Sequence, residues 1–314
     1  GASGDTVNVV GTLQNNGSAV EVDSVTFKEG GTNFTNSLLV GTDSTGTLSS
    51  ADGNTGVGTG VLAALTSGDN NVAVGLNALD ANTTGNNNTA LGSSALTTNT
   101  TAANNTALGT NALGANTTGG NNAAVGRSAL CSNTTAASNT AVGVCALLTT
   151  TTSGNNTAVG FCALKTTSTD CNAAFGTNAL RDQTTGGCNT AVGSSAGLRT
   201  TTGAENTAVG KSALFANTTG GQNTALGALA LDANTTGSQN VGLGNETLGT
   251  NTTGATNVAV GFAALHANTT ASNNTAIGHR SLQANTTGTE NVASGSCALA
   301  SNTTASYNTA VGFE

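Results

Sequence analysis

The cysteines are the side chains whose spacing most directly indicates chemistry. Cys145 and Cys162 are separated by the same number of positions, seventeen, as Cys171 and Cys188. If the chain forms stacked coils of that length, each pair lies about 4.8 Å apart, within the Cα separation that a disulfide allows. We therefore predict Cys145–Cys162 and Cys171–Cys188 bridges, which would indicate an extracellular or virion setting. The alternative is that all six cysteines are small buried hydrophobic residues.

The other reactive side chains do not group into a recognisable active site. The chain has two histidines, His266 and His279, and no Ser-His-Asp arrangement can be argued for either. Asp80 and Asp232 are too far apart along the chain to act as a glycosidase pair. There is no CxxC pair, no GGxGxD calcium repeat and no glycine-rich phosphate loop. We expect no enzymatic activity, no cofactor and no bound metal.

Asparagine and threonine offer two further kinds of chemistry. Asn-Thr-Thr is an N-glycosylation sequon, although turn chemistry that happens to match it is the favoured interpretation. Stacked threonines also resemble the hydroxyl arrays of ice-binding solenoids, but adjacent residues on a strand point to opposite faces, so one face receives a single rank. The sequons begin at Asn82, Asn99, Asn116, Asn133, Asn217, Asn234, Asn251, Asn268, Asn285 and Asn302.

All these residues belong to one sequence motif that the chain repeats in tandem. In its clearest copy, Asn206-Thr-Ala-Val-Gly210 leads to Ala213-Leu214 and then to Asn217-Thr-Thr-Gly220. The glycine that ends the Asn-Thr-Ala-Val-Gly segment recurs sixteen times. Fourteen of the fifteen intervals between these glycines are seventeen residues long, and the interval from Gly160 to Gly176 is one residue shorter. A period near 20 that persists this long is typical of a solenoid.

Numbering each repeat from its first asparagine gives positions 1 to 17. Position 3 is Ala or Gly, position 4 is a large apolar residue in all copies except Ser294, and position 9 is nearly always Leu. The strict asparagine column at position 1 predicts an asparagine ladder whose amides join coil to coil. Its members are Asn54, Asn71, Asn88, Asn105, Asn122, Asn139, Asn156, Asn172, Asn189, Asn206, Asn223, Asn240, Asn257, Asn274, Asn291 and Asn308.

The spacing predicts an all-β fold, a parallel β-solenoid with two short strands per 17-residue coil. One strand is expected at the Thr-Ala-Val-Gly segment and the other at the Ala-Leu segment. Fifteen steps of about 4.8 Å give a rod of roughly 70 Å. Residues 51–314 form this rod, and residues 1–50 form an N-terminal β region that caps or attaches it. Within that region we expect strands at 7–13, 19–27 and 37–40.

The rod strands predict an oligomer. Positions 2 and 4 of a strand face one way and positions 1, 3 and 5 the other. Both faces are small or apolar, which is typical of strands covered on both sides, so the valines and leucines should fill a core and a second copy should cover the other face. Closed symmetry favours a homotrimer, with the Asn-Thr-Thr-Gly turns facing water.

The composition limits the classes of partner that we expect. The formal net charge is −8, only 7% of residues are charged, and no basic run occurs, so electrostatic binding to nucleic acid or anionic lipid is not expected. No run of about 18 apolar residues exists, so membrane insertion is not expected either.

The phrase NTAVGxxALxxNTTG over residues 51–314 resembles the repeats of trimeric phage and bacterial tail-fibre proteins and, more distantly, the head repeats of trimeric autotransporter adhesins. The resemblance implies a trimeric structural fibre or adhesin rod on a virion or cell surface. Such a rod would space or present a receptor-binding tip, and a cell-surface glycan or receptor is its expected partner. The alternatives are a self-assembling extracellular filament joined end to end and an ice-binding solenoid.

Overall fold

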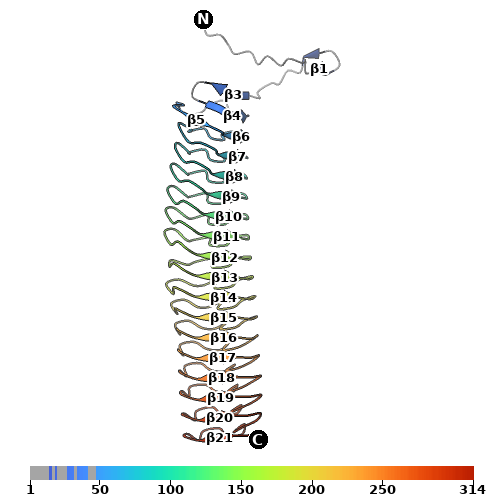
Figure 1. The fold of residues 1–314 in the computed structure, drawn as a ribbon, viewed down its shortest axis with the longest axis vertical. Coiled ribbons are helices and arrows are strands. Elements are labelled where there is room, and N and C mark those ends of the chain that lie inside the picture. Colours follow the sequence, from blue (N-terminus) through green and yellow to red (C-terminus); the bar gives the residue numbers. More distant parts are fainter. Residues whose placement is uncertain (1–13, 16–17, 20–26, 32–33, 42–46) are drawn as a thin grey trace.

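The computed structural model describes residues 14–15, 18–19, 27–31, 34–41 and 47–314. The described chain forms a long rod in which the strands stack in sequence order along one axis (Figure 1). It is a parallel β-solenoid of about 16 turns, and no helix occurs among the described residues. The predicted strand 7–13, and residues 20–26 of the predicted strand 19–27, lie outside them.

Each coil contributes one strand of three residues, at positions 2 to 4. Neighbouring strands pair in parallel and in register, so that Thr207 is opposite Thr224 and Ala208 is opposite Ala225. The strands are β6 (Thr55–Val57), β7 (Val72–Val74), β8 (Thr89–Leu91), β9 (Thr106–Leu108), β10 (Ala123–Val125), β11 (Thr140–Val142), β12 (Thr157–Val159), β13 (Ala173–Phe175), β14 (Thr190–Val192), β15 (Thr207–Val209), β16 (Thr224–Leu226), β17 (Val241–Leu243), β18 (Val258–Val260), β19 (Thr275–Ile277), β20 (Val292–Ser294) and β21 (Thr309–Val311).

The predicted second strand of each coil does not form. The Ala-Leu segment, where that strand was expected, lies in a continuous turn over positions 6 to 11. The leucine at position 9 has a left-handed backbone, with φ 51° at both Leu79 and Leu214. Position 7 is left-handed as well, with φ 56° at Ser212. Two such residues two positions apart cannot belong to a β-strand, whose φ lies between about −60° and −160°.

The core is thinner than the sequence predicted. The side chains at positions 3, 8 and 9 are buried, as Ala208, Ala213 and Leu214 illustrate at 2%, 0% and 1% exposure. The large residue at position 4 was expected to share this core, but it points outward: Leu226 is 49% exposed. A coil this short encloses room for one leucine and two alanines, so the opposite face of the strand must be the outer surface of the rod.

The periodic stacking begins before residue 51. Strand β4 (Phe34–Val40) contains the predicted strand 37–40 and pairs in parallel with β6, while Leu39 enters the core at 0% exposure. β4 also pairs with the short strand β5 (Ala51–Asp52). On its other side, β4 pairs antiparallel with β3 (Phe27–Gly31), which covers the first edge of the sheet (Figure 1). A separate antiparallel pair joins β1 (Gln14–Asn15) and β2 (Ser18–Ala19).

The shortened coil, 156–171, keeps its place in the stack. Its strand pairs with β13 without a shift of register. The missing residue falls in the turn before the next coil, where Thr169 supplies the carbonyl that Asn156 Nδ2 contacts at 2.9 Å. The Thr169 hydroxyl donates to the carbonyl of Gly186 at 2.7 Å. Hydrogen bonds therefore bridge the shortened turn.

Candidate functional surfaces

The position-1 asparagines stack as a continuous internal column. The backbone N–H of Asn71 donates to Oδ1 of Asn54 at 3.0 Å, and the Asn71 Nδ2 donates to the carbonyl of Gly85 at 2.9 Å. The first of these bonds repeats in every coil as far as Asn308. Each side-chain amide therefore joins its own coil to the following one through Oδ1 and closes its own turn through Nδ2, so these asparagines hold the scaffold together.

A second internal column, which the sequence analysis missed, lies at position 12. The Asn99 Nδ2 donates to Asn82 Oδ1 at 2.9 Å and to the carbonyl of Ala102 at 3.1 Å. This column contains Thr150, Thr167, Gln183 and Thr200 in its middle and resumes at Asn217. The recurrence of asparagine at position 12 is visible in the sequence, but an Asn-Thr-Thr-Gly run is equally typical of an exposed turn.

This second column contradicts the expectation that the whole Asn-Thr-Thr-Gly turn faces water. The ten sequon asparagines are its members, and all except Asn302 are fully buried, at 0% exposure. Their Nδ2 atoms are occupied by carbonyls of the same turn, as in Asn234 to Gly237 at 2.9 Å. A glycan on such a nitrogen is incompatible with this packing, because the folded coil leaves the atom no path to solvent.

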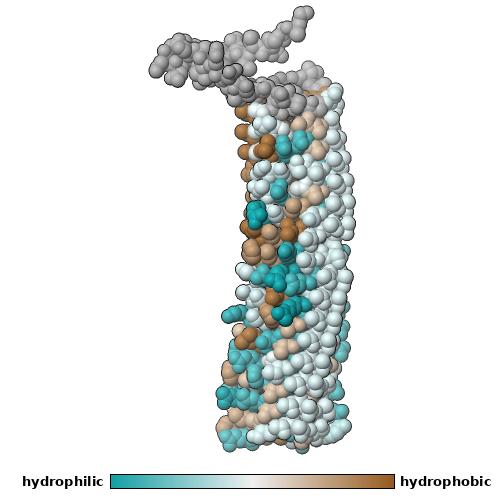
Figure 2. Space-filling view, turned by 180° about the vertical axis from the view of Figure 1, so that it is seen from behind, coloured by the Kyte–Doolittle hydropathy of each residue, from teal (hydrophilic) through white to brown (hydrophobic). Residues whose placement is uncertain are grey.

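The two threonines of the turn have different environments. The position-13 hydroxyl donates to the carbonyl of the next coil, as in Thr218 to Thr235 at 3.0 Å. The position-14 threonine is exposed, as at Thr219 and Thr236. One exposed rank of hydroxyls therefore runs along the rod, in agreement with the expectation of a single rank. The space-filling view shows an unbroken band of near-neutral residues along one side (Figure 2).

The six cysteines are free thiols, and neither predicted bridge is present. Stacked residues project their side chains in the same direction, so their Cβ atoms keep the coil spacing of about 4.8 Å, whereas a disulfide needs about 3.8 Å. Burial raises the pKa of the Cys162 and Cys131 thiols, and the neighbouring Cys145 raises both further. These two thiols are therefore protonated at neutral pH and poorly nucleophilic.

Among the described residues, the histidines and carboxylates do not converge on a reaction centre. The His266 Nδ1 contacts the carbonyl of Glu246 at 3.2 Å, and the His279 ring stacks on Phe262 with centroids 5.6 Å apart. Desolvation by burial raises the pKa of Asp232, an effect that backbone N–H groups and His266 partly offset. No cluster of three or more metal-ligating side chains occurs in the described part of the chain.

The cations gather on one surface, although the sequence shows no basic run. All six Lys and Arg residues of the rod occupy the turn at positions 6, 7, 10 and 11. Four of them, Lys165, Arg181, Arg199 and Lys211, belong to successive coils. The turn also carries most of the rod's exposed aromatic rings. Figure 2 shows a band of mixed hydropathy along the rod, with hydrophilic residues gathered about half-way.

The outer face of the strands is the main apolar surface. Position 4 exposes its large side chains along the whole rod, as at Val57 (42%), Val192 (39%) and Ile277 (45%). Position 2 on the same face is mostly Thr. Because the strands pair in register, these side chains form a straight stripe, which is larger than the isolated apolar residues usual on a monomer surface.

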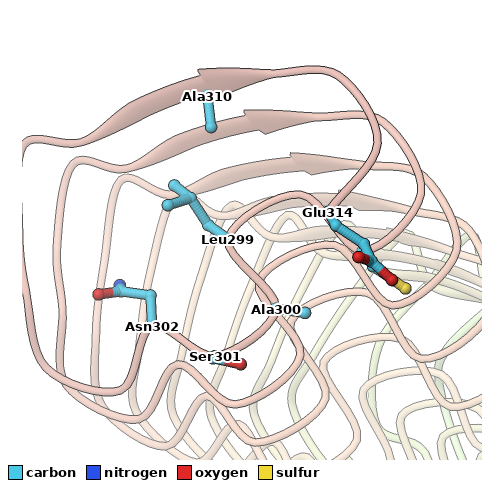
Figure 3. A pocket seen from close by; sticks show the side chains of 7 residues that line it. Leu299, Ala300, Ser301, Asn302, Ala310 and Glu314 are labelled. Carbon is cyan, nitrogen blue, oxygen red and sulfur yellow. The ribbon is translucent and has the colours of Figure 1, made fainter.

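A hollow of about 560 Å³ lies at the last coil (Figure 3). It exposes Leu299 and Ala310, whose counterparts in the preceding coils, Leu282 and Ala293, are fully buried. The surface is therefore built from the groups that stack coil on coil elsewhere. Its lining consists of Cys297, Leu299, Ala300, Ser301, Asn302, Ala310 and Glu314.

The comparisons with known proteins do not assign a function to these surfaces. No protein-family model matches the chain, and no curated protein matches it significantly. Within the described residues, no helix has the length and hydrophobicity that a membrane span requires.

Proposed function

We propose that this chain is the shaft of a homotrimeric structural fibre on a virion or cell surface, where it spaces or presents a receptor-binding region. The observation that supports the proposal is the apolar stripe on the outer face of the strands. It is straight and apolar in fifteen of the sixteen coils, Ser294 being the exception, and a second copy can cover it along its full length. The resemblance of the repeat to trimeric tail-fibre repeats favours three copies around one axis.

The size of the stripe is sufficient for association. Covering one half-exposed Val or Leu stabilises by on the order of 1 kcal/mol. The fifteen apolar residues at position 4 therefore supply about 15 kcal/mol per chain, compared with an association cost of about 4–15 kcal/mol. The exposed threonine rank belongs to the Asn-Thr-Thr-Gly turn and not to the strand, so pairing of the strand faces does not require it to be covered.

The oligomeric state in solution tests the proposal. Light scattering coupled to size exclusion should give three times the chain mass of 30.0 kDa. The double variant Val192→Glu/Leu226→Glu places carboxylates on the stripe, where like charges would meet around the axis, and should be monomeric.

The matched control is Thr202→Glu/Thr236→Glu, which adds the same charges in the same coils on the exposed threonine rank. It should remain trimeric. A monomeric wild-type protein would contradict the proposal, and an open-ended polymer would favour the end-to-end filament instead.

A further inference from the structure

The turn at positions 6 to 11 is where the repeats differ from one another. Positions 1, 3, 5, 8 and 9 are nearly invariant within the chain, whereas positions 6, 7 and 10 range from Gly and Ser to Phe, Arg and Asp. In solenoids, the recurring positions build the scaffold and one variable face commonly binds a ligand. The side chains of this turn therefore indicate what the face could recognise.

Half-way along the rod, this face is basic in an acidic protein. Lys165, Arg181, Arg199 and Lys211 come from four successive coils, so at about 4.8 Å per coil they extend over roughly 15 Å. The only acid on the variable turn of these coils is Asp182. The local surface is positive, although the whole chain has a net charge of −8.

Three of these four cations form no ion pair with a described residue. Arg181 is held by Asp182, with Nε to Oδ1 at 2.7 Å and Nη2 to Oδ2 at 3.0 Å. This is the one salt bridge among the described residues. The other acids of these coils lie in the turn before the strand, where Asp170 Oδ1 accepts from the Gly154 N–H at 2.8 Å. Lys165, Arg199 and Lys211 can therefore meet an external anion.

Two aromatic rings belong to the same coils as these cations. The guanidinium of Arg199 lies 5.2 Å from the centroid of the Phe215 ring, a cation–π contact that fixes the orientation of the guanidinium. Phe161 is 54% exposed and shares a coil with Lys165. An exposed ring presents a flat apolar face, and the C–H face of a sugar ring is its complement. Cations beside exposed rings therefore fit a ligand that is both anionic and cyclic.

We propose that Phe161, Lys165, Arg199, Lys211 and Phe215 form a binding strip for an acidic polysaccharide that carries carboxylate or sulfate groups and lies along the rod. The inference deepens the proposed role at a surface, on which its biological setting rests. The strip belongs to the variable turn and not to the strand face, so a trimer can form without covering it.

The charge balance favours a polysaccharide over other polyanions. Duplex DNA carries one charge per about 1.7 Å, and three unpaired cations on a chain of net charge −8 do not neutralise such a density. An anionic membrane is recognised by clusters of about four to eight Lys or Arg residues. A linear acidic glycan has sparser charges and adds the ring faces that Phe161 and Phe215 can contact.

Binding of defined polymers to the full chain tests the proposal. Polygalacturonate supplies carboxylates, dextran sulfate supplies sulfates, and neutral dextran supplies sugar rings alone. Calorimetry at low salt should detect binding of at least one acidic polymer and none of neutral dextran. The affinity should fall as salt is raised, because the contacts are exposed charges.

Two variants locate the site. Lys165→Gln/Lys211→Gln should weaken binding at least tenfold, and Phe161→Ala should weaken it without changing the salt dependence. The matched control, Arg127→Gln/Arg280→Gln, removes two cations from the same turn outside the strip and should bind within twofold of wild type. Circular dichroism confirms that each variant is folded.

The proposal is overturned if neither acidic polymer binds, if the two double variants weaken binding equally, or if duplex DNA or anionic vesicles bind more tightly than both acidic polymers. Light scattering on the same samples keeps the outcomes separate, because a trimer that fails to bind refutes the strip alone. A monomer that binds refutes the trimer alone.

Discussion

The buried amides show how single residues hold this rod together. An asparagine side chain has both a donor and an acceptor, so it can receive a bond from one coil and donate to another. A threonine in the same column bonds differently: the Thr167 hydroxyl donates to the carbonyl of Thr169 within its own coil at 3.3 Å and accepts from Gln183 Nε2 at 3.4 Å. At position 12, an asparagine is therefore fully hydrogen-bonded only if the residue in the next coil donates to its Oδ1.

That dependence leads to a prediction at Thr150. The Oδ1 of Asn133 is the one buried side-chain atom without a hydrogen-bond partner among the described residues. In the other parts of the column, the next asparagine supplies that bond, but here the next residue is Thr150, whose hydroxyl donates instead to the carbonyl of Thr167 at 3.3 Å. Thr150→Asn alone supplies the missing donor but leaves its own amide oxygen facing Thr167, whose hydroxyl donates to Thr169, so stability should change by less than about 0.5 kcal/mol. Thr150→Asn/Thr167→Asn extends the ladder to Gln183, whose Nε2 already lies 3.4 Å from the Thr167 hydroxyl, and should stabilise the fold by about 1 kcal/mol.

Denaturant unfolding followed by circular dichroism measures the effects of Thr150→Asn and of Thr150→Asn/Thr167→Asn. Thr152→Asn, two residues away on the exposed rank, is the control and should leave stability unchanged within about 0.5 kcal/mol. A double variant that is no more stable than wild type would contradict the prediction.

A second prediction at the residue scale concerns the pH dependence of stability around Asp232. Burial raises its folded pKa above the unfolded value, and Glu246 raises it further, while His266 lowers it. The folded state therefore binds more protons than the unfolded state between those two pKa values, so stability falls as pH rises through that window. Asp232→Asn removes this penalty.

Thermal unfolding between pH 3 and pH 7 tests the assignment of Asp232. The Tm of Asp232→Asn should exceed that of wild type at pH 7, and the two curves should converge as the pH falls towards the unfolded pKa of about 3.9. A variant that is less stable at pH 7, by an amount that does not change with pH, would show that the carboxylate contributes a structural bond instead.

At the scale of the coil, the glycines stacked at position 5 cannot be replaced by larger residues without loss of stability. Gly193 has φ +136°, and a Cβ there would lie 2.6 Å from the carbonyl oxygen of Gly210 in the next coil. Backbone cannot yield as a flexible side chain can. Gly193→Ala should therefore cost about 3 kcal/mol or more, from left-handed strain and displacement of the neighbouring coil.

Gly187→Ala is the matched control for this column. A Cβ at Gly187 would meet nothing closer than the carbonyl of Asp170 at 3.6 Å, so the change should be within about 0.5 kcal/mol. Unfolding midpoints and resistance to proteolysis measure both variants. Equal stability of the two would show that the coils can separate locally at Gly193.

The coil also shows what could and could not be read from the sequence. The period fixes the coil length, the parallel register and the position of the strand at Thr-Ala-Val. It does not reveal that Leu214 bends into a left-handed turn, because the preference of leucine for other regions is overridden by its burial in the core. The outward direction of Val192 was missed for a related reason: apolar residues on both faces indicate two covered sides, and only three-dimensional closure decides which side is inside.

The candidate surfaces were less predictable than the fold. The binding strip combines residues such as Lys165, Arg199 and Lys211 from within four successive coils, which are separated in sequence by a dozen or more residues, so the sequence shows no local basic run there. The cysteine pairs were correctly placed in adjacent coils, but spacing alone gives no side-chain direction. Recurring positions thus predict scaffold, while the varying positions acquire meaning only once the coil is closed.

At the scale of the whole molecule, each coil contacts only its neighbours, so stability is close to a sum of equivalent interfaces. Removing one complete period should therefore leave the rest intact. Deletion of residues 223–239 brings Asn206 next to Asn240, and Gly210 next to Gly244, in the columns they already occupy. The shortened protein should keep its circular dichroism spectrum and its Tm within a few degrees, and small-angle scattering should show a rod about 4.8 Å shorter.

Deletion of residues 223–231 alone removes half a period and places Asp232 where the register requires Asn223, so the coils that follow lose their columns and the Tm should fall sharply. If both deletions behaved alike, the columns would not set the register, and the interfaces between coils would have to be held by something other than their aligned asparagines, glycines and alanines.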